Sequence, residues 1–165
     1  MTHRAHAGES PVRVVTVTVS DTRTAADDEG GALLGELLRG AGFTVLRHAI
    51  VPDEPERLRA TVLAALDEGA DAVISTGGTG IAPRDQTYEA VSGLLDKTLD
   101  GFGEAFRRLS WEQVGARSIL SRAVAGTRGR GVVIALPGSP KALRLAVEAL
   151  IAPTLGHMVA LLRGG

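Results

Sequence analysis

The stretch "ADAVISTGGTG", Ala70 to Gly80, decides the fold predicted for this chain. Its first half is short, apolar and bounded by small residues, which is typical of a strand buried in a parallel sheet. Three glycines and two threonines follow where that strand ends. Because glycine lets the backbone approach another group closely, this composition raises the question of whether the turn holds a ligand.

Strand-like and helix-like segments alternate on both sides of this stretch. Short β-branched or apolar runs predict strands at residues 12–20, 43–51, 70–76 and 131–139. Apolar residues at helical spacing predict helices at residues 29–42, 54–69, 86–99, 101–115 and 140–162, the last kinked near Pro153. The alternation predicts a single three-layer α/β domain over residues 12–165, with a mostly parallel, doubly wound sheet, after a disordered tail at residues 1–11.

Composition narrows the classes of function. A chain of 165 residues with 44% hydrophobic and 3% aromatic residues builds its core from Val, Leu, Ile and Ala. The absence of cysteine excludes disulfides, thiolate zinc sites and cysteine nucleophiles. A net charge of -1 disfavours nucleic-acid binding. We find no signal peptide and no apolar run that we judge long enough to span a bilayer, and therefore expect a cytoplasmic protein that binds no membrane.

Three polar turns are expected at one edge of the sheet. They are "SDTRT" after the first strand, "STGGTG" after the third and "LPGSPK" after the last. Ligands of open α/β sheets bind outside the carboxyl ends of the strands. The sequence therefore predicts one pocket built from these turns.

The glycine turn matches neither of two familiar phosphate loops. No lysine follows Gly80 as in a P-loop, and Pro83 occupies the place of the third glycine of the dinucleotide fingerprint. Two interpretations stay open: a simple tight turn, or main-chain amides that bind an anion. The following Arg84 can pair with an anionic group, and Asp85 can either cap the next helix or bind Mg²⁺.

Four motifs in order resemble one family. "STGGTGIAPRDQTYEA", "GFGEAFR", "SILSRAVAG" and "LPGSPKA" resemble the molybdenum cofactor biosynthesis proteins of the MogA/MoaB type, with the gephyrin G-domain among their relatives. The resemblance extends from about Val12 to about Leu162. It implies a molybdopterin adenylyltransferase, which transfers AMP from ATP to the terminal phosphate of molybdopterin with Mg²⁺ as cofactor and releases pyrophosphate. It also implies a homo-oligomer, trimeric or hexameric, and a molybdenum-inserting enzyme as a partner.

The resemblance also assigns residues. Asp53 and Asp85 match the acidic positions implied to be catalytic and to hold Mg²⁺. The positions that it assigns to substrate and nucleotide binding are Ser20, Asp21, Thr76, Gly77, Gly78, Thr79, Gly80, Arg84, Ser121, Pro137, Gly138, Ser139 and Lys141. The chain departs from the family in "DEGG", where Gly30 replaces a serine and removes one hydroxyl.

Other interpretations of these residues stay open. Asp53 is equally consistent with a solvated carboxylate before a helix that starts near Pro55, and Asp21 with a residue that caps its own turn. For the whole chain, the alternative to the enzyme is a MoaB-type carrier that binds molybdopterin or a nucleotide without turnover. A scaffold with a vestigial pocket is a third, weaker alternative.

Overall fold

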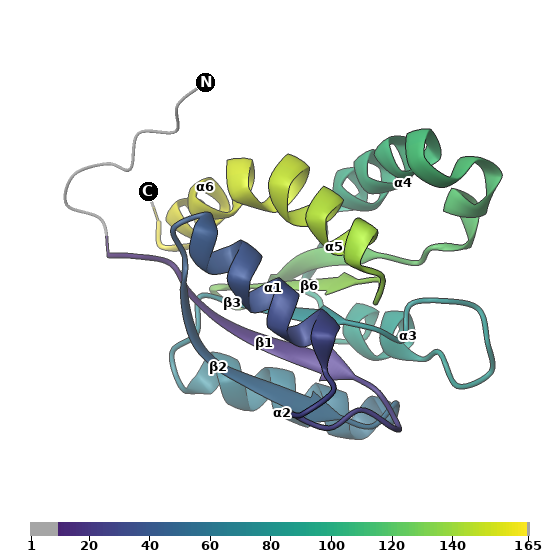
Figure 1. The fold of residues 1–165 in the computed structure, drawn as a ribbon. Helices are drawn as coiled ribbons and strands as arrows, with labels where there is room; N and C mark the ends of the chain where they lie inside the picture. Colours follow the sequence, from purple (N-terminus) through teal and green to yellow (C-terminus); the bar gives the residue numbers. More distant parts are fainter. Residues whose placement is uncertain (1–9, 165) are drawn as a thin grey trace.

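The computed structural model describes residues 10–164, and residues 1–9 of the predicted tail lie outside the described part of the chain. Its centre is one six-stranded sheet in the order β2-β1-β3-β6-β5-β4 (Figure 1). The strands are β1 (Arg13–Val19), β2 (Thr44–Val51), β3 (Ala72–Thr76), β4 (Lys97–Thr98), β5 (Val124–Arg128) and β6 (Gly131–Leu136). The first four strands of that order are parallel, and β5 and β4 pair antiparallel, so the predicted mostly parallel sheet is confirmed.

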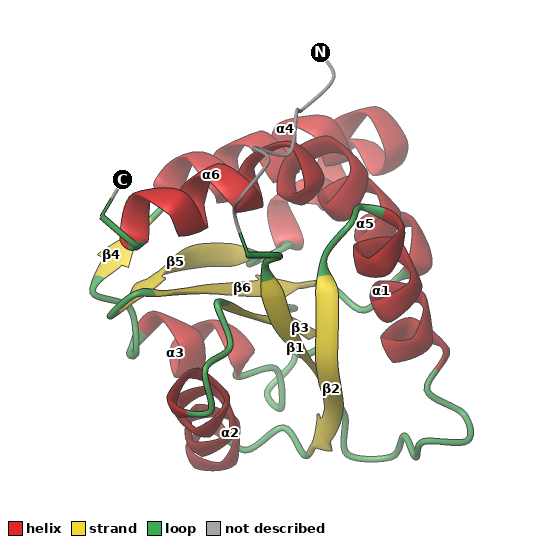
Figure 2. Cartoon of the chain, turned by 90° about the vertical axis from the view of Figure 1, so that its left-hand side faces the viewer, coloured by secondary structure: helices red, strands yellow, loops and turns green. Residues whose placement is uncertain are grey.

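Helices cover both faces of the sheet, as Figure 2 shows. Their bounds are α1 (Glu29–Gly40), α2 (Pro55–Asp67), α3 (Thr87–Ser92), α4 (Asp100–Val114), η1 (Gly115–Leu120), α5 (Pro140–Leu145), η2 (Ala146–Ile151) and α6 (Ala152–Leu162). One face packs against α1, α4 and the C-terminal helical segment, and the other against α2 and α3. The chain is thus a single α/β domain of three layers.

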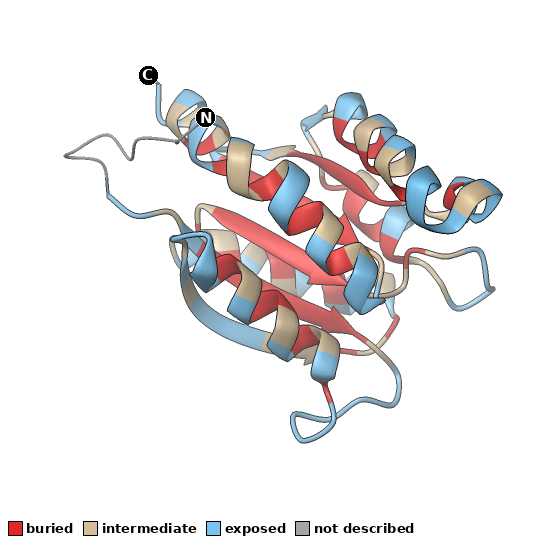
Figure 3. Ribbon diagram, turned by 45° about the horizontal axis from the view of Figure 1, so that its top comes forward, coloured by how far each residue is buried: buried red, intermediate tan, exposed pale blue. Residues whose placement is uncertain are grey.

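Figure 3 shows that the buried residues lie on the central strands and on parts of the helices. The buried cores on the two faces contain almost only aliphatic side chains. Phe102 and Phe106 of α4 are the aromatic exceptions among the buried residues of the described chain. The expected Val, Leu, Ile and Ala core is therefore confirmed. The central strands are buried on both faces, whereas the edge strand β2 is largely exposed.

The first two crossovers of the chain pass over opposite faces of the sheet. The connection from β1 to β2 runs through α1 on one face, and the connection from β2 to β3 runs through α2 on the other. A switch of this kind opens a crevice between the carboxyl ends of β1 and β3, where doubly wound folds bind ligands. The glycine turn begins directly after β3 and so borders this crevice.

The helix predicted for residues 86–99 is wrong in its second half. α3 ends at Ser92, and the following segment pairs with β5, where the amide of Asp96 donates to Thr127 O at 2.7 Å and that of Leu99 to Ala125 O at 2.8 Å. The main-chain amides of this segment are hydrogen-bonded to a neighbouring strand and not within a helix, which satisfies them equally well. The prediction also missed β5, whose glycine and short length hide the strand pattern.

The C-terminal helical segment, Pro140–Leu162, corrects another expectation. It has 23 residues, and an 18-residue window within it has a mean hydropathy of 1.8, so it is long and apolar enough to span a membrane by length and composition. Such a helix is weak evidence for a membrane span, since core helices pass the same test. Here its buried side chains pack on the sheet; they are Leu143, Ala146, Val147, Ile151, Leu155 and Val159. The predicted irregularity near Pro153 is present as the π-helical turn η2 just before it.

Candidate functional site

The three polar turns meet at the carboxyl edge of the sheet. The amide of Gly77 donates to Leu136 O at 2.9 Å. A methyl group placed on Gly138 would lie 3.7 Å from the α-carbon of Gly77, and one placed on Gly77 would lie 2.5 Å from Val19 O. The turns after β1, β3 and β6 therefore touch through main-chain atoms at Gly77.

The glycine turn presents unpaired amides. Gly77 and Gly78 have φ of 99° and 72°, conformations that L side chains rarely adopt. Thr87, at the start of α3, holds the turn in place: its amide donates to Gly78 O at 3.1 Å, and its hydroxyl donates to Gly77 O at 3.0 Å. Within residues 10–164, the amides of Gly78, Thr79 and Gly80 donate no main-chain hydrogen bond. Unpaired amides at a strand-to-helix turn suit an anion.

Three carboxylates gather beside this turn, two of them the predicted Asp53 and Asp85. Asp53 is 8% exposed and accepts a hydrogen bond at 3.2 Å from the amide of Gln86, the residue after Asp85. Its own amide donates to Asp21 Oδ1 at 3.0 Å. Burial raises the pKa of Asp53, the Gln86 amide lowers it, and the charges of Asp85 and Asp21 raise it again. The structure therefore places Asp53 and Asp85 together.

Arg84 is engaged by the third carboxylate. Its Nε and one terminal nitrogen donate to the two oxygens of Asp21, at 3.0 and 2.8 Å. This bidentate pair lowers the pKa of Asp21 and raises that of Arg84. An anionic ligand would therefore meet Arg84 with its Nε and one terminal nitrogen already engaged by Asp21.

The capping interpretations of the acidic residues are wrong. Gln86, not Asp85, occupies the N-cap position of α3, without a side-chain capping hydrogen bond, and Asp85 Oδ2 instead accepts the amide of Ala82 at 2.9 Å. α2 starts at Pro55 as expected, but Asp53 is buried and not solvated, so that interpretation of Asp53 is wrong as well. Ser20, not Asp21, closes the turn after β1, because its hydroxyl accepts the amides of Thr22 and Arg23. Asp21 and Asp53 are thus free of these local roles, whereas Asp85 closes the turn from Ala82 to Asp85.

The other predicted residues lie around the turn in different environments. Thr76 donates from its hydroxyl to Pro137 O at 3.1 Å. Ser139 caps α5 by accepting the amide of Ala142 at 3.2 Å, and Lys141 is exposed in the first turn of that helix. The Ser121 hydroxyl is buried and has no hydrogen-bond partner. Ser121 is next to Arg122, whose amide donates to Thr79 O at 3.0 Å.

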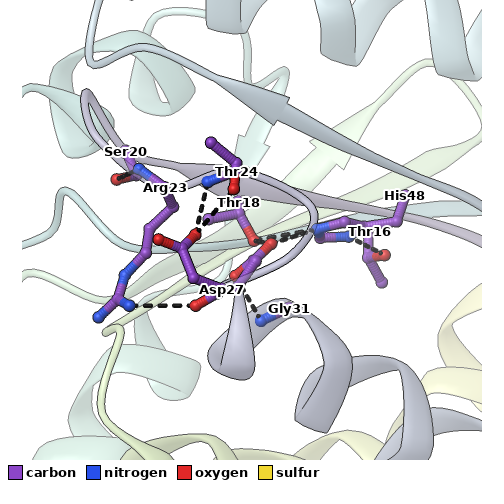
Figure 4. A network of polar contacts seen from close by, with 9 residues as sticks. Thr16, Thr18, Ser20, Arg23, Thr24, Asp27, Gly31 and His48 are labelled. Carbon is purple, nitrogen blue, oxygen red and sulfur yellow. Dashed lines mark hydrogen bonds and ion pairs between the residues drawn. The ribbon is translucent and has the colours of Figure 1, made fainter.

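Sequence reasoning missed the polar network that anchors the loop between β1 and α1 (Figure 4). Asp28, buried and at the N-cap of α1, accepts the amide of Gly31 at 2.9 Å and the hydroxyl of Thr18 at 2.7 Å. His48 Nε2 lies 2.8 Å from Asp28 Oδ2, and its Nδ1 lies 2.7 Å from the Thr16 hydroxyl. Two threonines facing the core in "VVTVTV" were the available signal. The network fixes the start of the helix that leads away from the site.

At position 30, where this chain has glycine and the resembled family has serine, there is room for the serine side chain. A methyl group at Gly30 would lie 3.5 Å from Gly138 O, an ordinary contact, and φ there is not positive. We predict that Gly30→Ser folds with a free energy of unfolding equal to or up to about 1 kcal/mol above the parent, because glycine costs entropy in a helix. Thermal unfolding checks this, and a fall of several degrees in Tm would contradict it.

No group of three or more His, Asp or Glu side chains able to hold a metal ion occurs within residues 10–164. A divalent cation at Asp53 and Asp85 would therefore need further ligands other than acidic and histidine side chains. Mg²⁺ ordinarily binds in this way, through one or two carboxylates together with substrate phosphates and water.

The fold and the site define a doubly wound α/β protein with unpaired amides and acidic side chains gathered at the carboxyl edge of its sheet. The chain belongs to the family described as "Probable molybdopterin binding domain", which matches residues 15–157.

Similar proteins agree with this assignment over nearly the whole chain. The Bacillus cereus protein called molybdenum cofactor biosynthesis protein B is 50% identical over 157 residues, 93% of each chain. A crystal structure of a molybdenum cofactor biosynthesis protein B has a TM-score of 0.91 at 49% identity, covering 94% of this chain and 98% of that one. The molybdopterin biosynthesis Mog protein from Mycobacterium ulcerans has a TM-score of 0.84 at 32% identity, covering 94% and 100%. The chain is thus a molybdenum cofactor biosynthesis protein, related to both the MoaB and the Mog types.

Proposed function

We propose that this protein is a molybdopterin adenylyltransferase. The observation that carries the proposal is the approach of two carboxylates, Asp53 and Asp85, to a glycine turn with unpaired amides. A carrier needs only the anion-binding amides. Adjacent carboxylates repel a phosphate unless a cation lies between them, and this favours phosphoryl chemistry over simple retention of the ligand.

The residues present fit Mg²⁺. Carboxylate oxygens are its preferred protein ligands, and the raised pKa of Asp53 reflects burial and negative charge that a bound cation would offset. Asp53 and Asp85 would hold the ion, and the substrate phosphates would complete its coordination. When bound, Mg²⁺ supplies neutralisation of the negative charge on the phosphates.

The chain's own residues then bind and orient two anionic substrates. The amides of Gly78, Thr79 and Gly80 receive phosphate oxygens. Arg84, exposed beside Asp21, and Lys141, exposed on α5, offset the remaining charge.

The reaction asks little covalent help from the protein. A terminal phosphate oxygen of molybdopterin attacks the α-phosphorus of ATP. The bond from that phosphorus to the bridging oxygen of the β-phosphate breaks, and pyrophosphate leaves with its electron pair. The attacking phosphate is already ionised, so no general base is required. Positioning and charge stabilisation account for the acceleration.

The test supplies purified protein with molybdopterin, ATP and Mg²⁺ and follows release of pyrophosphate and formation of adenylyl-molybdopterin. Stoichiometric pyrophosphate that depends on molybdopterin supports the enzyme. Saturable binding of molybdopterin or ATP without product would instead establish the carrier. If neither ligand binds in calorimetric titrations, the remaining interpretation is a scaffold with a vestigial pocket.

We expect the charged Asp53 side chain to lower the free energy of unfolding of the protein when no ligand is bound. Since the folded state raises its pKa, Asp53 destabilises the protein at pH values where it is charged, and this cost disappears as the pH falls through its pKa. We predict that Asp53→Asn increases the free energy of unfolding at pH 7 by about 0.5–2 kcal/mol while turnover is lost. Asn keeps an oxygen to accept the Gln86 amide. Denaturant titrations at pH 7 and pH 4 check the prediction: the gain should shrink at the lower pH, and a less stable variant at pH 7 would contradict it.

We also propose that the protein works as a homo-oligomer. The end of α4 and η1 expose four large apolar side chains, those of Trp111, Val114, Ile119 and Leu120. Surfaces of this kind are typical of subunit contacts. Light scattering coupled to gel filtration distinguishes a trimer or hexamer from a monomer, and a monomer at micromolar concentration would contradict the proposal. We propose a molybdenum-inserting enzyme as the partner that receives the product.

A further inference from the structure

The side chain of Arg122, which follows η1 and precedes β5, reaches into the loop between the glycine turn and α3. Its Nε donates to Gly80 O at 3.0 Å, and one terminal nitrogen donates to Asp85 O at 2.9 Å. These two carbonyls are the two ends of the segment 80–85. One rigid guanidinium therefore ties the end of the glycine turn to the main chain of Asp85.

The guanidinium is itself held in place. The Glu89 carboxylate of α3 pairs with both terminal nitrogens, and the Tyr88 ring lies beneath the guanidinium, 5.4 Å from its carbon to the ring centroid. The pair lowers the pKa of Glu89. The Arg122 side chain is 28% exposed, which leaves it more buried than Arg84 at 63%.

The Arg122 main chain reinforces the same connection. Its amide donates to Thr79 O at 3.0 Å, so that backbone and side chain together hold Thr79, Gly80 and Asp85. Because its Nε and both terminal nitrogens already donate to protein oxygens, Arg122 is poorly suited to bind a ligand anion. Arginine suits this role because its planar fork presents several donors in fixed directions, which lysine lacks.

We propose that Arg122 is a positioning residue, which sets the distance between the anion-binding amides and the Asp85 carboxylate. The consequence for turnover rests on the proposed adenylyl transfer; the consequence for the loop does not. Without the Arg122 guanidinium, the segment 80–85 should move, and the Asp85 carboxylate should shift relative to the amides of the glycine turn. A displacement of about 1 Å at a reacting centre costs on the order of 100-fold in rate.

The first measurement needs no ligand. Four amides of the loop region are hydrogen-bonded, namely those of Ala82, Asp85, Gln86 and Thr87, and their hydrogen exchange reports its order. In Arg122→Lys we expect exchange of this segment to accelerate about tenfold or more, through local opening, while β1 and β3 keep the parent rates. Glu89→Gln, which leaves Arg122 in place but weakens its support, should give a smaller acceleration of the same segment. The matched control is Arg128→Lys, because Arg128 also donates to a carbonyl, Leu94 O at 3.2 Å, but far along β5.

The second measurement separates binding from chemistry. In Arg122→Lys we expect kcat to fall about 10- to 100-fold with KM for ATP changed less than threefold, since the amides remain. Arg128→Lys should match the parent in both. The proposal would be overturned if the loop of Arg122→Lys exchanged at the same rate as in the parent, or if the variant had the same kcat as the parent. The positive charge of lysine alone would then be enough to hold the loop in place. If the parent protein shows no adenylyl transfer, the proposed function fails, and the exchange measurement alone decides the role of Arg122.

Discussion

Replacing Asp85 by asparagine is expected to leave the protein folded and able to bind ATP, but to lower turnover about 100- to 1000-fold. The substitution removes one negative charge next to Asp53, where a cation would bind. Removing one preorganised electrostatic group commonly costs this much in kcat. The asparagine oxygen can still accept the amide of Ala82, so the turn that Asp85 closes should persist.

Pyrophosphate release under saturating ATP and molybdopterin measures this loss, and calorimetry with ATP measures the binding that should survive. Asp96→Asn is the matched control, because Asp96 also accepts a turn amide, that of Gly129 at 2.6 Å, on the remote end of the antiparallel strands. It should turn over like the parent. If Asp85→Asn turned over at the parent rate as well, Asp85 would have no catalytic role.

Replacing Gly77 by alanine is expected to lower the free energy of unfolding by about 2–4 kcal/mol and to abolish turnover. Two costs combine at this position. The φ of 99° is strained for any L side chain, and the added methyl would lie 2.5 Å from Val19 O, a main-chain atom that cannot rotate away. Relief of the clash must separate the turns after β1 and β3, which together form the site.

Denaturant unfolding and the turnover assay test this prediction together. Gly101→Ala is the control, because a methyl there meets no atom within 4 Å and α4 gains a better helix former. Its stability should equal or slightly exceed that of the parent. A stable and active Gly77→Ala variant would mean that the turns do not meet as described.

The parallel half of the sheet could be predicted from the sequence because its strands are continuous apolar runs. Strands β1, β3 and β6 are buried on both faces, and this gives them a pattern that no helix shares at their length. The antiparallel half could not be predicted. β4 has two residues, and β5 combines a glycine with an exposed end, so that both are defined by pairing with a neighbour and not by their own residues.

The site could be predicted only in part, for a related reason. The position of strand ends follows from the order of the elements, so the approach of the turns containing Asp53 and Asp85 was predictable. The partners that side chains choose depend on distances in three dimensions. Neither the Asp21–Arg84 pair, 63 residues apart, nor the reach of Arg122 across 42 residues to Gly80 leaves a pattern in the sequence.

The location of a bound cation tests most directly whether Asp53 and Asp85 form a metal site beside the glycine turn. A crystal structure of the protein with ATP and Mn²⁺ in place of Mg²⁺ locates the metal by its anomalous scattering. We predict a single peak between the carboxylates of Asp53 and Asp85, with nucleotide phosphates on the amides of Gly78 to Gly80. A nucleotide that lies elsewhere on the molecule, or a metal bound by neither aspartate, would contradict it.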